Sequence, residues 1–410
     1  MIELHRKKES LYIGQHSIVD LAQQFHTPLY LYSEAVLRHQ CQKLKKALPD
    51  VEISYSAKAN SNVSLLKIIK SEGIGIDAMS VGEIIQANAA GYASQDILFV
   101  SNNVSAEKFS LLAETGIERL VADSLDQMRL WLKAKPGAKV ILRLNPSQGA
   151  GHHSKVITAG KVKFGLDPQL LDQAVEEARA LGGSVNGLMI HIGSLFLSPE
   201  PWLDAIDWLL EIARGYPGIE YLDFGGGLGV TYDRTQQADF PLEEFGTQLA
   251  LRIAQYKQQT QTNPIFAIEP GRFLVAECGC CVAQVQSTKT NNGIRFVGTD
   301  LGFNFFVRPE MYGSYHEIIH STKTANTNEQ VQVVGNVCES GDYLGKDRYL
   351  PSTDVGDLLV IRDTGAYGFS MSSNYNSMPK PAEVLIKIDN STQVIRKAQD
   401  ADEILRGQLY

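Results

Sequence analysis

Three features are scarce in this sequence of 410 residues: cysteines, clusters of basic residues and long apolar runs. The formal net charge is −8 and no dense Lys/Arg block occurs, which argues against a nucleic-acid surface because phosphate neutralisation needs clustered cations. No apolar run approaches the ~20 residues of a membrane helix, and no apolar stretch follows the N-terminal charges as in a secretory signal. We therefore expect a cytoplasmic protein with neither nucleic acid nor membrane as a partner.

The five cysteines are odd in number, and Cys278, Cys280 and Cys281 crowd together. This pattern suits reduced thiols better than a disulfide framework. The three have no partnering His or Cys pair at zinc-finger spacing, whereas cysteine packs well as a small buried hydrophobe. We expect buried thiols and no metal site.

Hydrophobic residues make up 44% of the chain and charged residues 20%, as in an ordinary globular protein. Its length exceeds the size at which one hydrophobic core usually stops growing, so two domains are expected.

Eight short apolar segments, each followed by a stretch of helical periodicity, occupy the first two thirds of the chain. The segments are Val51–Ser56, Ile74–Ala78, Ile97–Val100, Arg119–Ala122, Val140–Leu144, Leu188–His191, Tyr221–Phe224 and Phe266–Glu269. The clearest helical stretches are Gly82–Ala90, Leu170–Leu181, Trp202–Arg214 and Leu242–Lys257. This alternation predicts a (β/α)8 barrel over residues 28–277.

Beyond about residue 277 the helical pattern fades and strand-like segments separated by turn residues take over. They are Cys281–Ser287, Ile294–Val297, Val331–Val337, Leu358–Arg362 and Val384–Ile388. We expect an antiparallel β domain of residues 278–410 together with 1–27, in which Leu11–Ile13 adds a strand.

Active sites of such barrels lie at the C-terminal ends of the strands. Lys58 follows the first predicted strand, Asp77 lies in the second, Arg143 in the fifth and His191 ends the sixth. A single lysine is most often a solvated charge, and a lone histidine is more often structural. A lysine in a cleft can nevertheless be desolvated and become nucleophilic, as Schiff-base chemistry requires.

The seventh strand runs into Asp223-Phe224-Gly225-Gly226-Gly227, and the eighth closes with Glu269-Pro270-Gly271-Arg272. Barrels commonly bind phosphate at the loops after strands seven and eight. A glycine turn alone is weak evidence, and a Glu/Arg pair can be a surface ion pair. A lysine, a histidine, a phosphate-type loop and a carboxylate around one cavity nevertheless form the set that pyridoxal phosphate requires.

Several motifs together resemble a known family. The segments are SYSAKAN, GIDAMSVGEI, HIGS, DFGGGLGV, EPGR, RPEMYGSYH, CESGDYL and GAYGFSMSSNYN. In this order, from about residue 28 to 390, they resemble the meso-diaminopimelate decarboxylase branch of the fold-type III pyridoxal-phosphate decarboxylases.

The resemblance implies a cofactor site in which Lys58 forms the Schiff base, with Asp77 close to it. His191 would stack on the pyridine ring, and Glu269 would keep the ring nitrogen protonated so that the ring accepts electrons. The phosphate would be held by Ser194, Gly225, Gly226, Gly227, Gly271, Arg272 and Tyr375.

The resemblance also implies that Cys338 reaches across a homodimer interface and protonates the carbanion after decarboxylation. Its substrate contacts would be Arg272, Arg308, Tyr312, Glu339 and Tyr375, with Arg143 as a weaker addition. Two arginines suit a distal carboxylate and Glu339 suits a distal ammonium, which favours diaminopimelate and L-lysine synthesis.

Some segments depart from the family pattern, among them Leu195–Ser198 after HIGS and the aromatic stretch Gly302–Phe306. A decarboxylase of ornithine, arginine, lysine or another amino acid therefore stays an alternative, as does a non-catalytic binding homologue. An amino-acid racemase is disfavoured, because in that group an arginine faces the ring nitrogen in place of Glu269.

Overall fold

The structure is a computed structural model that describes residues 4–151, 153–324 and 328–409. Positions 1–3, 325–327 and 410 of the expected β domain, and 152 of the expected barrel, lie outside these ranges. The chain divides into two compact units. The barrel unit consists of Gln40–Thr231 and Ala238–Phe273, and the β unit of the chain through His39, Tyr232–Gln237 and the chain from Leu274 onward.

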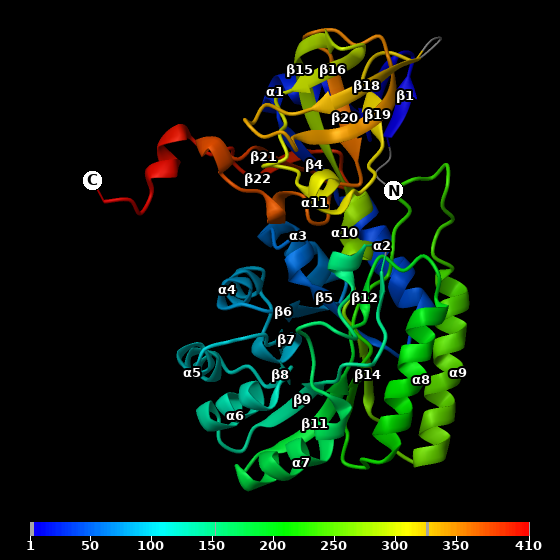
Figure 1. The fold of residues 1–410 in the computed structure, drawn as a ribbon, viewed down its shortest axis with the longest axis vertical. Helices are drawn as coiled ribbons and strands as arrows, with labels where there is room; N and C mark the ends of the chain where they lie inside the picture. Colours follow the sequence, from blue (N-terminus) through cyan, green and yellow to red (C-terminus); the bar gives the residue numbers. More distant parts are fainter. Residues whose placement is uncertain (1–3, 152, 325–327, 410) are drawn as a thin grey trace. The chain divides into compact units, whose positions relative to one another are not determined.

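Eight parallel strands close into a barrel in the barrel unit (Figure 1). Each of the eight predicted segments overlaps a strand, since short apolar runs that are buried on both faces are typical of parallel strands. The sixth segment, Leu188–His191, is strand only through Met189, and its strand begins earlier, at Ser184. Around the barrel the strands are β5 (Glu52–Ser56), β6 (Gly75–Ala78), β7 (Ile97–Val100), β8 (Arg119–Ala122), β9 (Lys139–Arg143), β11 (Ser184–Met189), β13 (Tyr221–Asp223) and β14 (Ile265–Ile268). The predicted barrel is confirmed.

Helices connect the barrel strands, and serine residues begin several of them. Ser80, Ser105 and Ser124 each accept a hydrogen bond from the backbone N–H three residues later, which satisfies one of the free donors at a helix start. The helices are α3 (Val63–Ser71), α4 (Val81–Ala89), α5 (Ala106–Glu114), α6 (Leu125–Ala134), α7 (Leu171–Ala180), α8 (Glu200–Arg214) and α9 (Leu242–Thr260). The four stretches with the clearest helical pattern are confirmed.

A nine-stranded sheet forms the core of the β unit. Its strands are β4 (Leu29–Ser33), β15 (Gly279–Asn291), β16 (Ile294–Thr299), β17 (Ile318–His320), β18 (Asn328–Val334), β19 (Tyr343–Pro351), β20 (Leu358–Arg362), β21 (Ala382–Ile386) and β22 (Thr392–Arg396). The long strand β15 pairs antiparallel with β4, β16 and β20. Most pairings are antiparallel as predicted, whereas β16 with β18 and β21 with β4 are parallel.

The two units differ from the expected boundaries, because residues 28–39, 232–237 and 274–277 of the expected barrel range belong to the β unit. The strand β4, which the expected barrel range includes, pairs with β15 and β21 in the β unit. Leu11–Ile13 forms a strand in the same unit, but within a separate small sheet of β1 (Leu4–Lys7), β2 (Ser10–Ile13) and β3 (His16–Ser17). Leu11 and Ile13 of β2 belong to the same buried hydrophobic cluster as Leu29 and Leu31 of β4. Local sequence pattern identifies such strands but not their partners.

The remaining elements are short, apart from two N-terminal helices. They are α1 (Ile18–Phe25), α2 (Glu34–Ala47), α10 (Arg272–Val275), α11 (Arg308–Tyr312), β10 (Ala150–Gly151) and β12 (Gly193–Ser194). The crowded cysteines Cys278, Cys280 and Cys281 are buried free thiols, as expected. Among the residues that the structure describes, no helix is both long and apolar enough to cross a membrane.

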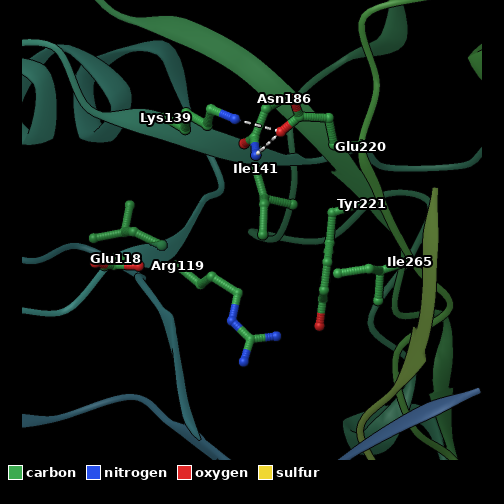
Figure 2. Close-up of a pocket in the computed structure, with 9 residues that line it drawn as sticks. Glu118, Arg119, Lys139, Ile141, Asn186, Glu220, Tyr221 and Ile265 are labelled. Carbon is green, nitrogen blue, oxygen red and sulfur yellow. Dashed lines mark hydrogen bonds and ion pairs between the residues drawn. The ribbon is translucent and has the colours of Figure 1, made fainter. Parts of the chain in front are cut away.

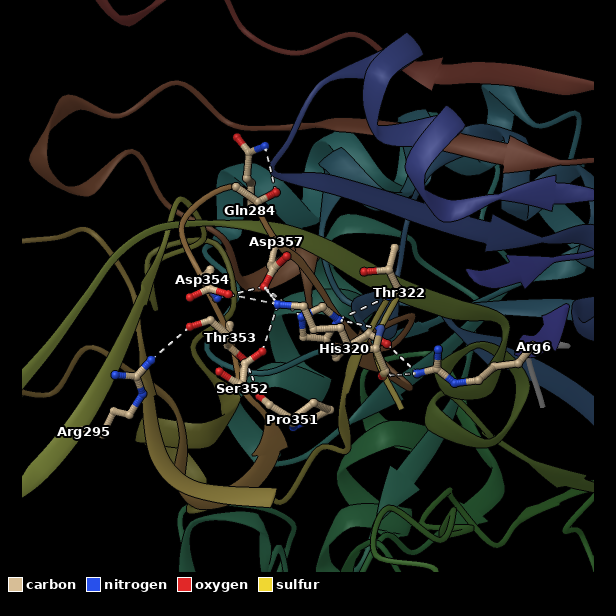
Figure 3. Close-up of polar contacts among 12 residues, drawn as sticks. Arg6, Gln284, Arg295, His320, Thr322, Pro351, Ser352, Thr353, Asp354 and Asp357 are labelled. Atoms are coloured by element: carbon tan, nitrogen blue, oxygen red, sulfur yellow. Dashed lines mark hydrogen bonds and ion pairs between the residues drawn. The ribbon is translucent and has the colours of Figure 1, made fainter. Parts of the chain in front are cut away.

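The β unit contains a buried histidine in a polar network (Figure 3). The Nδ1 atom of His320 accepts the backbone N–H groups of Thr322 at 3.2 Å and Lys323 at 3.1 Å. Its Nε2 atom lies 3.0 Å from the carboxylate of Asp357, which Lys323 also contacts. Burial lowers the pKa of His320, and the Asp357 carboxylate opposes this shift only in part. The folded protein therefore holds the ring neutral.

This network predicts an acid-dependent loss of stability. An unfolded histidine binds a proton below about pH 6.5, so stability from the neutral ring is present above that pH and is lost as pH falls. In urea unfolding at pH 7.5 and 5.5, the wild type should lose more stability than His320→Asn, whose amide oxygen accepts without titrating. His320→Leu should be destabilised by about 1–3 kcal/mol at pH 7.5. Equal pH dependence in wild type and His320→Asn would contradict this role.

Candidate active site

Lys58 lies directly after β5, at the C-terminal end of the barrel strands. Its side chain is 42% exposed, and Nζ lies 3.7 Å from Oδ2 of the buried Asp77. The Ser56 hydroxyl donates to the same Asp77 oxygen at 2.7 Å. Two groups thus hold the Asp77 carboxylate, and this carboxylate in turn positions an accessible lysine.

His191 follows β11 and has a defined tautomer. Its Nδ1 atom accepts the backbone N–H of Gly226 at 3.0 Å, so the proton of the neutral ring is assigned to Nε2. Removal from water, and then the charges of Arg143 and Lys58, lower the pKa of His191 well below its usual value. The ring is therefore neutral and fixed in orientation.

The glycine loop after β13 passes close to its neighbours. A Cβ atom on Gly225 would overlap the carbonyl oxygen of Ile190, and one on Gly226 would overlap that of Glu269. Gly227 has φ +132°, and a Cβ there would overlap the ring of Phe196. Only glycine lets the backbone come so close at these positions.

The N–H groups of this loop already have acceptors at two positions. Gly225 donates to Asp223 Oδ1 at 2.8 Å and Gly226 donates to His191 Nδ1. These two glycines therefore position His191 and Asp223. Phosphate binding by Gly225, Gly226 and Gly227 stays a prediction.

Besides Asp77, two further carboxyl groups are enclosed at this end of the barrel. Glu269 is 3% exposed, and within the described residues its Oε1 atom has no hydrogen-bond partner. Burial, and then the charges of Asp223 and Asp77, raise the pKa of Glu269 well above its usual range. Burial is also the main cause that raises the pKa of Asp223 to about 7. A ligand group that shares a proton with Glu269 would relieve this arrangement.

Two arginines of the barrel unit are also buried nearby. Arg272 donates from Nη2 to the Ser194 hydroxyl at 3.0 Å. Arg143 donates from Nη2 to the backbone carbonyl groups of His191 and Thr158. Arg272 and Ser194 form a polar pair suited to an anion, while Arg143 supports the segment that carries His191.

Three features of this end of the barrel fit pyridoxal phosphate as a cofactor. The lysine is accessible, the histidine ring is oriented, and a buried carboxyl oxygen has no partner in the described chain. The barrel unit carries Lys58, Asp77, Arg143, His191, Ser194, Gly225, Gly226, Gly227, Glu269, Gly271 and Arg272 of the predicted site.

The other predicted site residues belong to the β unit: Arg308, Tyr312, Cys338, Glu339 and Tyr375. Cys338 is exposed, and its backbone N–H donates to the Asn376 side chain at 2.9 Å. This bond joins the Cys338 loop to the segment that carries Tyr375. The buried Asp342 carboxylate accepts the N–H groups of Val337 and Phe303 and so fixes the start of the Cys338 loop.

A pocket also lies at the opposite end of the barrel (Figure 2). It is lined by residues at the N-terminal ends of strands, namely Glu118, Arg119, Leu120, Lys139, Ile141, Asn186, Glu220, Tyr221 and Ile265. Lys139 pairs with Glu220, and Arg119 pairs with Glu52. Residues at this end of such barrels serve stability, and these charged groups already pair with one another. We therefore place the active site at the Lys58 end.

Sequence reasoning missed two residues of the site. Ser56 and Asp223 were both visible at strand ends, but neither was predicted as a site residue. Ser56 matters through its bond to Asp77, and Asp223 through its burial beside Glu269. The signal was their position, two residues before Lys58 and two before Gly225.

Comparison with known proteins shows the family to which the chain belongs. Residues 34–276 match the family described as "Pyridoxal-dependent decarboxylase, pyridoxal binding domain". The diaminopimelate decarboxylase of Methanothermobacter thermautotrophicus is 37% identical over 98% of this chain and 96% of that protein. That of Archaeoglobus fulgidus is 35% identical over 95% of each.

The chain belongs to the pyridoxal-dependent decarboxylases, in the diaminopimelate decarboxylase branch. The solved structure of the M. jannaschii diaminopimelate decarboxylase in complex with L-lysine has a TM-score of 0.91. It is 29% identical and covers 99% of this chain and 98% of its own. The family and the fold predicted from sequence motifs are thereby confirmed, and with them the cofactor, pyridoxal 5′-phosphate.

The glycine loop gives a direct test of the site in this decarboxylase. Gly226→Ala should move Glu269 or His191, lower stability by about 1–3 kcal/mol and weaken binding of pyridoxal phosphate. Gly218→Ala is the matched control, since a Cβ at that position meets nothing within 4 Å. Urea unfolding and a spectroscopic titration with the cofactor measure both effects. Equal cofactor affinity in the two variants would show that the loop does not shape the site.

Proposed function

We propose that this chain decarboxylates meso-2,6-diaminopimelate to L-lysine and carbon dioxide, using pyridoxal phosphate at the Lys58 end of the barrel. The observation that carries the site is the buried Glu269 oxygen, which has no partner in the described chain and lies at the same strand ends as Lys58 and His191. The substrate assignment is supported by full-length relatives that bear this name.

Bound pyridoxal phosphate supplies an electron-accepting ring that takes up the electron pair left when carbon dioxide departs. Lys58 would hold the cofactor covalently, with Asp77 keeping the amine in place. Glu269 would share a proton with the ring nitrogen, and the neutral His191 ring would stack on the pyridine face.

The phosphate of the cofactor would be held by the hydroxyl groups of Ser194 and Tyr375 and by backbone donors of Gly227, Gly271 and Arg272. Gly225 and Gly226 contribute by letting the loop pack against the chain around His191 and Glu269. This division of roles follows from the acceptors that Gly225 and Gly226 already have.

For the substrate, we assign the proton that replaces the lost carboxylate to the Cys338 thiol. Arg308 and Arg272 would bind the distal carboxylate and Glu339 the distal ammonium. Tyr312, Tyr375 and, more weakly, Arg143 would complete the substrate contacts. Carbon dioxide leaves from one end of the substrate, and one proton is added there. This reaction is the same for any amino acid, so the enzyme would recognise diaminopimelate by the groups at its opposite end.

We also propose a cytoplasmic homodimer in which Cys338 serves the partner's site. Support comes from the thiols: all five cysteines are free, and Cys338 is the exposed one. Free thiols suit a reducing compartment, and an exposed thiol is available to a second chain.

A product assay tests the proposed substrate. Purified enzyme with pyridoxal phosphate should release carbon dioxide and L-lysine from meso-diaminopimelate, and turn over L-lysine, L-ornithine and L-arginine far more slowly. Lys58→Ala should abolish turnover, because no covalent cofactor link can form. Turnover of another amino acid in preference to diaminopimelate would refute the substrate assignment while leaving the cofactor site standing.

Mixed chains test the shared site. Cys338→Ala should bind pyridoxal phosphate nearly as the wild type does, yet turn over slowly. When mixed and re-associated with Lys58→Ala chains, about a quarter of the sites should contain both an intact lysine and an intact cysteine if the dimers assort at random. Activity should therefore return to a fraction of the wild-type value. If the mixture stays as inactive as its two components, Cys338 acts within its own chain or not at all.

A further inference from the structure

The guanidinium of Arg308 is almost fully buried at the start of α11, with 1% of the residue exposed. Its Nε donates to His316 Nε2 at 3.3 Å, and its Nη2 donates to the Ser314 hydroxyl at 3.2 Å. Its carbon Cζ lies over three aromatic rings, at 5.2 Å from Tyr232 and 5.9 Å from Tyr312 and Tyr367. These hydrogen bonds and ring contacts restrict the rotation of the guanidinium.

His316 makes two hydrogen bonds that define its tautomer. Its Nδ1 atom lies 2.9 Å from the backbone carbonyl oxygen of Arg362. A carbonyl oxygen can only accept, so Nδ1 carries the proton and Nε2 keeps the lone pair that Arg308 requires. A doubly protonated ring would set an N–H against the N–H of Arg308. The contact therefore exists only with the neutral ring in this tautomer.

The His316 ring is itself locked by packing. It is fully buried, the Tyr232 ring lies 4.6 Å away and Phe306 packs edge-on at 4.7 Å and 83°. Tyr367, whose ring faces Arg308, has φ +56°, a left-handed conformation that costs energy for a residue other than glycine. Several elements of the β unit thus converge on one guanidinium.

We infer that His316 is a positioning residue for substrate selection: by accepting from Nε, it fixes the plane in which Arg308 presents its fork to the distal carboxylate of the substrate. The inference rests on the function proposed above. Arginine binds carboxylates through a planar fork, so a rotation of the guanidinium weakens the pair even when the charge stays in place. His316 would act through Arg308 and would not touch the reacting atoms.

Two substitutions separate this role from simple packing. The amide of His316→Gln reaches the position of Nε2 and can accept from Arg308. The shorter amide of His316→Asn reaches only the position of Nδ1, so it can still donate to the Arg362 carbonyl but cannot accept from Nε. Both variants are polar and smaller than histidine, which makes them a matched pair. His320→Asn, the same replacement at another buried histidine of the same unit, is the control for the effect of a His→Asn change away from Arg308.

The measurements are kcat and KM for meso-diaminopimelate by carbon dioxide release, inhibition by L-lysine, which also carries a carboxylate, and affinity for pyridoxal phosphate. In His316→Asn we expect about a tenfold rise in KM and in the L-lysine inhibition constant, the size expected for one hydrogen bond to a charged group. The kcat and the cofactor affinity should change less than about threefold. His316→Gln should recover most of the KM, and His320→Asn should keep the wild-type KM.

The outcomes are distinct. Equal KM values in His316→Asn and His316→Gln, or a KM rise in His320→Asn as large as in His316→Asn, would overturn the inference. In an Arg308→Lys background, which has no Nε–H, His316→Asn should raise KM no further; an additive rise would also overturn it. If the wild type produces no L-lysine from meso-diaminopimelate, the proposed function fails first and the inference fails with it.

Discussion

Three carboxyl groups enclosed at one end of the barrel, on Asp77, Asp223 and Glu269, set the constraint that the site must satisfy. Closing eight parallel strands brings their C-terminal ends together, so side chains far apart in sequence share one low-dielectric region. Asp77 is stabilised by Ser56 and Lys58. Burial raises the pKa of Asp223 to about 7 and that of Glu269 well above its usual range. Glu269 thus requires either a proton or a partner that shares one, and the ring nitrogen of the cofactor would be such a partner in the function proposed above.

The glycine loop after β13 fits into this crowded region because its residues have no side chains. Gly225 and Gly226 use their N–H groups to hold Asp223 and His191, and the absence of side chains lets the loop approach the carbonyl groups of Ile190 and Glu269. The same glycines that suggest a phosphate loop in the sequence therefore make hydrogen bonds to side chains of the protein itself. The bond from Gly226 fixes the tautomer of His191 and the orientation of its ring.

In the β unit, neighbouring groups likewise fix the orientation of one side chain, the guanidinium of Arg308. Arg308 is buried, and its hydrogen bonds to His316 and Ser314 restrict the rotation of its guanidinium. His316 can do this only because a backbone carbonyl determines which of its nitrogens carries the proton. In both units one backbone group, the Gly226 N–H or the Arg362 carbonyl, fixes which ring nitrogen of a histidine carries the proton.

The sequence by itself determined the barrel strands, the family and the residues at the strand ends. Strand and helix periodicity are local, and motifs such as SYSAKAN and DFGGGLGV carry their spacing with them. Only the tertiary structure decided the pairing of Leu29–Ser33 with β15 and β21, since strand partners are chosen by contacts between distant segments. It also decided which carboxyl oxygens, Oε1 of Glu269 among them, are buried without a hydrogen-bond partner in the described chain, and which ring nitrogen of His191 and His316 accepts. Burial and hydrogen-bond direction depend on what surrounds a side chain, and no local pattern records that.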